Sequence, residues 1–223
     1  MSHMDHIKAV IFDLDNTILN RTKTFEGFTQ SLIDTYFGHL ESTEHIQQRI
    51  IELDEDGYKY KTMLFNELLQ ELPWNEKPPH EELMTFYSRE YVLNSVLMDE
   101  AREVVQYLKG KYSIGLITNG QTDIQHGKID QLGIREDYDH IIVSEEAGVK
   151  KPDSRIFQMA LDYFGLEPKQ CLYIGDHPVN DIQGAAKAGM STIWIKVNQP
   201  WPEGIEAAPI HTIQELRELR DIL

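Results

Sequence analysis

The sequence predicts an α/β protein whose core is a Rossmann-like parallel sheet, with a bundle of helices inserted into it. Three observations support this prediction. Short apolar runs recur along the chain, amphipathic helical segments separate them, and one long stretch near the N-terminus carries helical segments only. Strands that alternate with helices pair in parallel through right-handed crossovers. We therefore expect an α/β core over residues 1–20 and 95–223 and a separate helical domain over residues 21–94.

Five short apolar runs are predicted to form the strands of the sheet. Most of them end at a polar residue or a glycine, and runs of this kind are typical of strands that a parallel sheet buries on both faces. The five runs are Ala9–Phe12, Ser113–Ile117, Ile141–Val143, Cys171–Ile174 and Thr192–Ile195.

Helical segments separate the later runs. Apolar residues at helical spacing predict helices around Val104–Leu108, Ile124–Leu132, Ile156–Phe164 and Ile182–Ala188. Asp153 precedes the third of these helices and is placed to cap it. The C-terminal tail is predicted to be a surface helix, because its apolar residues also follow helical spacing: Ile213, Leu216, Leu219 and Leu223.

The stretch over residues 21–94 contains no convincing strand. Its apolar residues fall on one face of each of four successive helical segments, which include Phe25–Tyr36, Ile46–Leu53, Leu64–Leu72 and Leu83–Tyr91. Four amphipathic helices in succession indicate a small bundle.

The composition disfavours several classes of function. Lys and Arg number 21 against 37 Asp and Glu, which leaves a formal net charge of −16 at pH 7. A chain this acidic is a poor binder of nucleic-acid polymers and of anionic membranes. No apolar run or N-terminal leader suggests a membrane span or secretion, and the single cysteine, Cys171, allows neither an intrachain disulfide nor a multi-thiolate zinc site. We therefore expect a cytoplasmic protein with no nucleic-acid or membrane partner; the oligomeric state stays open.

Polar side chains follow three of the predicted strands at the points where the strands end. In a parallel sheet these points lie along one edge, which is where α/β proteins bind ligands. We therefore expect the polar residues to meet in one crevice, although they lie far apart in the sequence. They are Asp13 and Asp15 after the first strand, Thr118 and Asn119 after the second, and Asp176 and Asp181 after the fourth.

Four carboxylates in one crevice require a compensating charge. Such groups cannot all stay ionised unless a cation is present or some of them hold protons. Carboxylate oxygens are suitable ligands for Mg²⁺, and the sequence has no cluster of His and Cys that would favour a softer metal. Lys151 adds a positive charge suited to a phosphoryl group. The residues therefore predict phosphoryl transfer assisted by Mg²⁺.

At these positions the sequence resembles the haloacid dehalogenase superfamily, in its phosphatase branch. Four motifs of that family occur in the expected order, and together they are far more specific than any one of them. The resemblance spans the whole chain, and it implies a haloacid dehalogenase-like fold in which residues 21–94 are the inserted cap domain. The motifs are Asp13–Thr17 for D-x-D-x-T/V, Thr118–Gly120 for the second, Lys151–Phe157 for the third, and Gly175–Ala185 for the fourth.

The resemblance implies a role for each acidic residue. Asp13 is the expected nucleophile, which forms a phospho-aspartyl intermediate, and Asp15 is the expected general acid and base. The implied Mg²⁺ ligands are the side chains of Asp13 and Asp176 and the backbone carbonyl of Asp15. Asp181 is implied to hold a metal-bound water or to orient Lys151.

The implied phosphate-binding residues are Thr118, Asn119 and Lys151, and Lys151 also neutralises the nucleophile. Taken singly, some of these residues have plainer interpretations: Thr118–Gly120 suits an ordinary turn, and Asp181 suits a helix cap. Lys150 is expected to be solvated, and His177 is expected to have a structural or supporting role.

The activity implied is that of a Mg²⁺-dependent phosphatase acting on a small phosphorylated metabolite: a nucleotide, phosphoglycolate or a sugar phosphate. Asp15 favours a phosphate ester over a halide, because a halide leaves without a proton. A phosphomutase of the same superfamily is the alternative enzyme. A receiver-like phospho-accepting signalling module is the alternative of another class, although such modules are typically shorter and lack a large insert. The residues of the cap that select the substrate are not predictable from the sequence.

Overall fold

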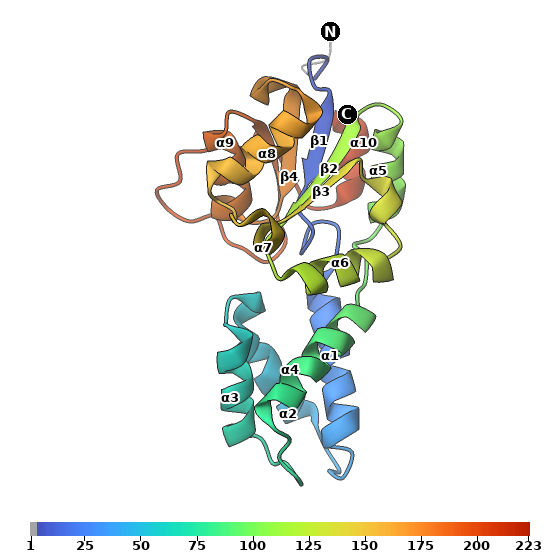
Figure 1. Cartoon of the computed structure of the whole chain (residues 1–223), viewed down its shortest axis with the longest axis vertical. Coiled ribbons are helices and arrows are strands. Elements are labelled where there is room, and N and C mark those ends of the chain that lie inside the picture. Colours follow the sequence, from blue (N-terminus) through green and yellow to red (C-terminus); the bar gives the residue numbers. More distant parts are fainter. Residues whose placement is uncertain (1–3) are drawn as a thin grey trace. The chain divides into compact units, whose positions relative to one another are not determined.

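The computed structural model describes residues 4–223, which form two compact units (Figure 1). The first unit comprises Met1–Asn20 and Leu97–Leu223, and the second comprises Arg21–Val96. The first unit contains all six strands of the described residues, and the second contains helices only. None of the helices of residues 4–223 combines the length and the apolar character that a membrane crossing requires.

The sheet of the first unit has six parallel strands in the order β3-β2-β1-β4-β5-β6. All five predicted strands form, so the prediction of a parallel α/β sheet is confirmed. The chain moves outward from β1 on one side and from β4 on the other, so β1 and β4 flank a topological switch point. The strands are β1 Ala9–Phe12, β2 Ser113–Thr118, β3 His140–Val143, β4 Cys171–Gly175, β5 Ser191–Ile195 and β6 His211–Ile213.

Helices cover both faces of this sheet (Figure 1). They are α5 Ala101–Lys109, α6 Thr122–Gln131, α7 Ser144–Ala147, α8 Ser154–Phe164, α9 Gly184–Lys187 and α10 Leu219–Ile222, with the short turns η2 Arg135–Asp137, η3 Pro168–Gln170, η4 Pro178–Gln183 and η5 Leu216–Glu218. Side chains alternate between the faces of a strand. Val10 of β1 therefore packs with Val104 of α5 on one face, and Ile11 packs with Phe157 of α8 on the other. The predicted cap of α8 also forms, because the Asp153 side chain accepts a hydrogen bond from the backbone N–H of Arg155.

The C-terminal tail differs from the prediction of a surface helix. His211–Ile213 forms the edge strand β6, which pairs in parallel with β5, and only short helical turns follow it. Ile213, Leu216 and Leu219 are buried in the core of the first unit. Apolar residues three apart fit a helix, but the backbone of β5 still needs hydrogen-bonding partners along its free edge, and β6 supplies them.

The second unit consists of the four predicted helices: α1 Arg21–Tyr36, α2 Glu44–Asp54, α3 Lys61–Glu71 and α4 His80–Leu93, with the short turn η1 Glu55–Gly57. The predicted apolar faces form its core, at the centre of which lies Phe28. The ring centroid of Phe28 lies 5.2 Å from that of Tyr87 and 6.2 Å from that of Phe65, and both pairs are edge-to-face. Such aromatic packing stabilises the bundle beyond the area that it buries.

The second unit also contains a group of charged side chains around the buried Asp54 and Arg21, with Asp56 and Lys61 partly buried beside them, and we call these four residues the Asp54 cluster. Asp54 is 1% exposed and accepts hydrogen bonds from Arg21 Nη2 at 2.5 Å and from Lys61 Nζ at 2.6 Å. Arg21 Nη1 lies 3.4 Å from Asp56 Oδ1. Two acidic groups thus contact two basic groups, and their charges balance.

Candidate active site

Parallel pairing brings the predicted site residues of the first unit to one edge of the sheet. Asp13 directly follows β1, and its backbone N–H donates to the Ile174 carbonyl of β4 at 2.9 Å. Phe12 is level with Leu116 of β2 and with Ile174 of β4. The residues that follow these three strands therefore lie side by side, and the central strand contributes Asp13.

Lys151 connects several of these residues. Its ammonium group is buried and donates hydrogen bonds to Asp13 Oδ1, to Asp181 Oδ1 at 2.7 Å and to Tyr173 Oη at 3.1 Å. It also donates to the Ile117 carbonyl at the end of β2, at 3.1 Å. The neighbouring Lys150 is exposed, as predicted. Lys151 therefore joins the ends of β1, β2 and β4 through a single positive charge.

Asn119 holds the backbone of Lys151 through its side chain. Its Oδ1 accepts from the Lys151 N–H at 2.9 Å, and its Nδ2 donates to the Lys151 carbonyl at 3.0 Å. Both ends of the amide are thus used within the protein. The side chain of Asn119 therefore positions Lys151.

Asp181 is held equally firmly. It is 1% exposed, and its Oδ2 accepts from the His177 N–H at 2.9 Å. Gly175 makes this position possible, because a Cβ at Gly175 would lie 2.5 Å from Asp181 Cγ. The Trp194 indole N–H, from β5, donates to the Asp176 carbonyl at 2.7 Å. No motif in the sequence pointed to this contact of Trp194.

Three carboxylates meet here: the ligand atoms of Asp13, Asp176 and Asp181 lie within 4.8 Å of one another. Together with Lys151 they form what we call the Asp13 cluster. Its three acidic groups outnumber its one basic group, Lys151, which pairs with Asp13 and Asp181. All of the donor atoms are hard carboxylate oxygens, so the group suits Mg²⁺ rather than a metal that prefers nitrogen or sulfur ligands.

The protonation of the Asp13 cluster reflects this imbalance. Burial raises the pKa of Asp13 from 3.8 to about 7, against the lowering effect of Lys151 and with a further increase from Asp181. Burial opposes the charge of Lys151, yet Asp13 and Asp181 hold the pKa of Lys151 well above its usual value. The lysine therefore stays charged, and the carboxyl group of Asp13 is the one that needs a further cation to stay ionised near neutral pH.

The Asp15 side chain has different partners, both on α6. Lys128 Nζ donates to its two carboxylate oxygens at 2.9 and 3.1 Å, and Gln125 Nε2 donates to Oδ2 at 2.9 Å. Gln125 also donates to the hydroxyl oxygen of Thr118. Sequence reasoning missed Gln125 and Lys128. Their signal was a pair of polar residues inside the buried stripe between Ile124 and Ile129.

His177 has a structural role, as expected. Its Nδ1 accepts from the N–H groups of Val179 and Asn180, each at 3.1 Å, and so caps the turn η4. Burial lowers the pKa of His177, which favours the neutral ring that this acceptor role requires.

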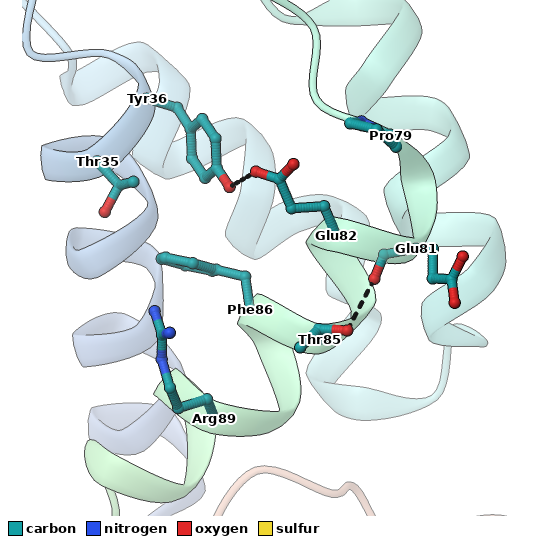
Figure 2. A pocket seen from close by; sticks show the side chains of 8 residues that line it. All are labelled: Thr35, Tyr36, Pro79, Glu81, Glu82, Thr85, Phe86 and Arg89. Atoms are coloured by element: carbon teal, nitrogen blue, oxygen red, sulfur yellow. Dashed lines mark hydrogen bonds between the residues drawn. The ribbon is translucent and has the colours of Figure 1, made fainter.

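The second unit has a hollow of about 600 Å³ of its own (Figure 2). It is lined by side chains of α1 and α4 and contains none of the predicted site residues. Two hydrogen bonds join polar groups of its lining: Tyr36 Oη donates to Glu82 at 2.9 Å, and Thr85 Oγ1 donates to the Glu81 carbonyl at 3.0 Å. Its geometry therefore points to no chemistry comparable with that of the Asp13 cluster.

The haloacid dehalogenase-like hydrolase family matches residues 7–189 of this chain. The glyceraldehyde 3-phosphate phosphatase of Pyrococcus abyssi is 29% identical over 194 residues, which are 85% of this chain and 82% of that protein. The pyrimidine 5'-nucleotidase YjjG of Escherichia coli is 36% identical over 125 residues, 55% of either chain. Among solved structures, the HAD-hydrolase YfnB of Bacillus subtilis has a TM-score of 0.81 at 24% identity and covers 97% of this chain and 98% of its own. This structural likeness shows the fold.

Proposed function

The chain belongs to the haloacid dehalogenase-like hydrolase family, as one of its phosphatases, and we propose that it hydrolyses small phosphomonoesters in a Mg²⁺-dependent reaction through a phospho-aspartyl intermediate. One observation carries the proposal: a buried carboxylate at the end of the central strand, Asp13, contacts a buried lysine and two further carboxylates. Three of the four motif regions supply these groups from distant parts of the sequence.

Asp13 is the proposed nucleophile. One of its oxygens attacks phosphorus, the ester P–O bond breaks, and the proton of Asp15 passes to the leaving alcohol oxygen. Lys151 already contacts Oδ1 of Asp13 and holds that carboxylate in place. Its charge also offsets that of the incoming phosphoryl group.

The second step regenerates the enzyme. Water attacks phosphorus, Asp15 takes one proton from it, and the acyl-phosphate bond to Asp13 breaks to release inorganic phosphate. Asp15 thus acts first as an acid and then as a base, which requires its carboxyl group to stay beside the reacting oxygen in both steps.

The residues proposed to hold Mg²⁺ are Asp13 and Asp176 through their side chains and Asp15 through its backbone carbonyl, supported by Asp181. When bound, Mg²⁺ would supply the positive charge that the Asp13 cluster lacks and would polarise the phosphoryl oxygens. Thr118, Lys151 and the main-chain N–H near Asn119 are proposed to bind the phosphoryl oxygens.

The proposed substrates are small phosphorylated metabolites. Among these, sugar phosphates such as glyceraldehyde 3-phosphate are the leading candidates. The relative that acts on this compound is similar over most of both chains, whereas the nucleotidase is similar over about half. We propose residues 1–20 and 95–223 as the catalytic core and residues 21–94 as the cap domain that selects the leaving group.

The test is phosphate release across a panel of sugar phosphates, nucleotides and phosphoglycolate. Each assay is run with Mg²⁺, with EDTA, and with Asp13→Asn. Asp162→Asn, an exposed aspartate on α8, is the matched control and keeps full activity. Release that needs both Mg²⁺ and Asp13 supports the proposal.

Two other results would contradict it. Interconversion of sugar phosphates without release of phosphate would indicate a phosphomutase. A phosphoprotein that is long-lived and does not turn over would indicate a receiver-like module.

A further inference from the structure

The α6 helix buries two polar side chains against the Asp15 carboxyl group. Lys128 and Gln125 are 3% and 2% exposed. A buried ammonium group is costly unless it is paired and hydrogen-bonded. The contacts of these two buried side chains should therefore show what holds them in the interior.

The contacts of the pair converge on Asp15. Lys128 Nζ bonds both carboxylate oxygens of Asp15, at 2.9 and 3.1 Å, and the Gln125 amide oxygen at 2.8 Å. Gln125 Nε2 bonds Asp15 Oδ2 and Thr118. Both oxygens of Asp15 are thus held by donors of one rigid helix, which fixes the rotation of the carboxyl group as well as its position.

The backbone at the start of this helix accommodates Gln125. Gly120 has a φ of +155°, and a Cβ there would lie 2.8 Å from the Gln125 side chain. A larger residue at position 120 would displace Gln125 from Asp15 and Thr118. The glycine of the second motif therefore makes room for the amide.

The alternative position for the Asp15 carboxyl group lies close by. Asp13, two residues earlier, belongs to the Asp13 cluster, whose carboxylate oxygens lie within 4.8 Å of one another and would surround a bound cation. A mobile Asp15 side chain could turn to that point and become a further ligand. Its contacts with Lys128 and Gln125 instead keep it on the α6 side of the site.

We propose that Lys128 and Gln125 are positioning residues that hold the Asp15 carboxyl group beside the leaving-group oxygen and away from the Asp13 cluster. This inference rests on the proposed phosphatase reaction. It predicts that the pair matters for bond cleavage only when the departing oxygen needs a proton.

Two esters separate this role from simple phosphate binding. The alkoxide of an alkyl phosphate must receive the Asp15 proton as the P–O bond breaks, whereas p-nitrophenolate leaves without one. Phosphate binding is the same for both esters. The relevant quantity is kcat/KM, because it covers the steps up to departure of the leaving group, and hydrolysis of the phosphoenzyme is common to both substrates.

The experiment compares Lys128→Met with the wild-type protein on the best alkyl phosphate of the panel and on p-nitrophenyl phosphate. We expect kcat/KM to fall about 10²- to 10³-fold for the alkyl ester and less than about 10-fold for the aryl ester. Gln125→Met, which keeps the ion pair, should show the same selectivity with a smaller loss. Lys150→Met, an exposed lysine changed in the same way, should change neither value.

A double-mutant cycle tests whether Lys128 acts through Asp15. In an Asp15→Ala background, Lys128→Met should cause no further loss on the alkyl ester. Thermal unfolding identifies a variant that does not fold, in which case Gln125→Met and its cycle with Asp15→Ala decide the question.

Equal losses on both esters, or no loss on either, would overturn the inference and leave the phosphatase reaction intact. A wild-type protein that releases phosphate from neither ester would overturn the proposed function itself.

Discussion

The two units of the molecule each bury a cluster of charged side chains, and the clusters differ in their charge balance. In the Asp54 cluster, two acidic groups contact two basic ones. The Asp13 cluster holds three carboxylates and one basic group, Lys151, which pairs with Asp13 and Asp181. Asp54 and Arg21 in one cluster, and Asp13, Asp181 and Lys151 in the other, are nearly inaccessible to water, so solvent compensates their charges only weakly.

The difference distinguishes a structural site from a functional one. A balanced buried cluster satisfies its own charges, and removing one member leaves the others unpaired. An unbalanced cluster costs stability by itself and is tolerated where a ligand completes it, so strongly perturbed pKa values collect at such sites. The following changes should therefore act in opposite ways on the two clusters.

The largest effect should follow from Asp13→Asn. Removing the nucleophile should lower kcat by at least about 10⁴-fold, measured as phosphate release. Thermal unfolding in Mg²⁺-free buffer should nevertheless occur at a higher temperature than in the wild-type protein, because one uncompensated buried carboxylate is gone. A variant that loses both activity and stability would contradict the assignment of the imbalance to Asp13.

In the other unit, Asp54→Asn should lower the free energy of unfolding by about 3–5 kcal/mol, because it removes the carboxylate that the buried Arg21 and the partly buried Lys61 share. Chemical or thermal denaturation measures this loss. Asp34→Asn, an exposed aspartate on α1, should change stability by less than about 0.5 kcal/mol. Equal effects of the two substitutions would mean that the Asp54 cluster contributes little to stability.

Addition of Mg²⁺ should stabilise the wild-type protein by about 2.7 kcal/mol at a hundredfold excess over its Kd, and EDTA should reverse the gain. A shift in the thermal unfolding temperature measures it. Asp176→Asn should abolish this gain in stability. Asp54→Asn should show the same gain, although the variant is less stable than the wild-type protein without Mg²⁺. An undiminished gain in Asp176→Asn would place the ion elsewhere.

The last effect concerns pH in the absence of Mg²⁺. The pKa of Asp13 is about 7 in the folded protein and 3.8 in its unperturbed state. Between these pH values the folded state binds a proton that the unfolded state has released. This group's contribution to stability should therefore fall as the pH rises from about 4 to about 7.

Unfolding temperatures measured over this range provide the check. The Asp54→Asn variant still contains Asp13 and should show its pH-dependent change in unfolding temperature. The Asp13→Asn variant should lack that change, so the difference in unfolding temperature between the two variants should vary with pH. A constant difference would show that Asp13 does not titrate there.

Much of the fold and of the candidate site could be predicted from the sequence. The strands and the four inserted helices have apolar periodicities that depend only on local geometry. Asp13, Thr118, Asp176 and Asp181 follow or adjoin strand ends, and the parallel topology brings these points together. Lys151 lies beyond α7 and was predicted from its charge and its motif.

The remaining features depend on tertiary contacts that leave little trace in the sequence. β6 is defined by its pairing with β5, and three residues are too few to show alternation. Lys128 resembles any helical lysine until the position of Asp15 is known. The two hydrogen bonds between the Asn119 side chain and the Lys151 backbone join residues far apart in the sequence, so no local pattern indicates them.

The strand order also has a consequence for synthesis of the chain on the ribosome. β1 is the first strand to be synthesised, but its partners are β2 and β4. Ala9 can therefore form its strand pairs only after Ser113 and Cys171 have been synthesised. All of Arg21–Val96 is synthesised in between, and its helices find their partners within that stretch. We expect a nascent chain that ends before Ser113 to carry a formed helical unit beside an apolar strand with no partner. Pairing so distant in sequence is slow, and the exposed edge of β1 makes this stage of synthesis the one most prone to aggregation.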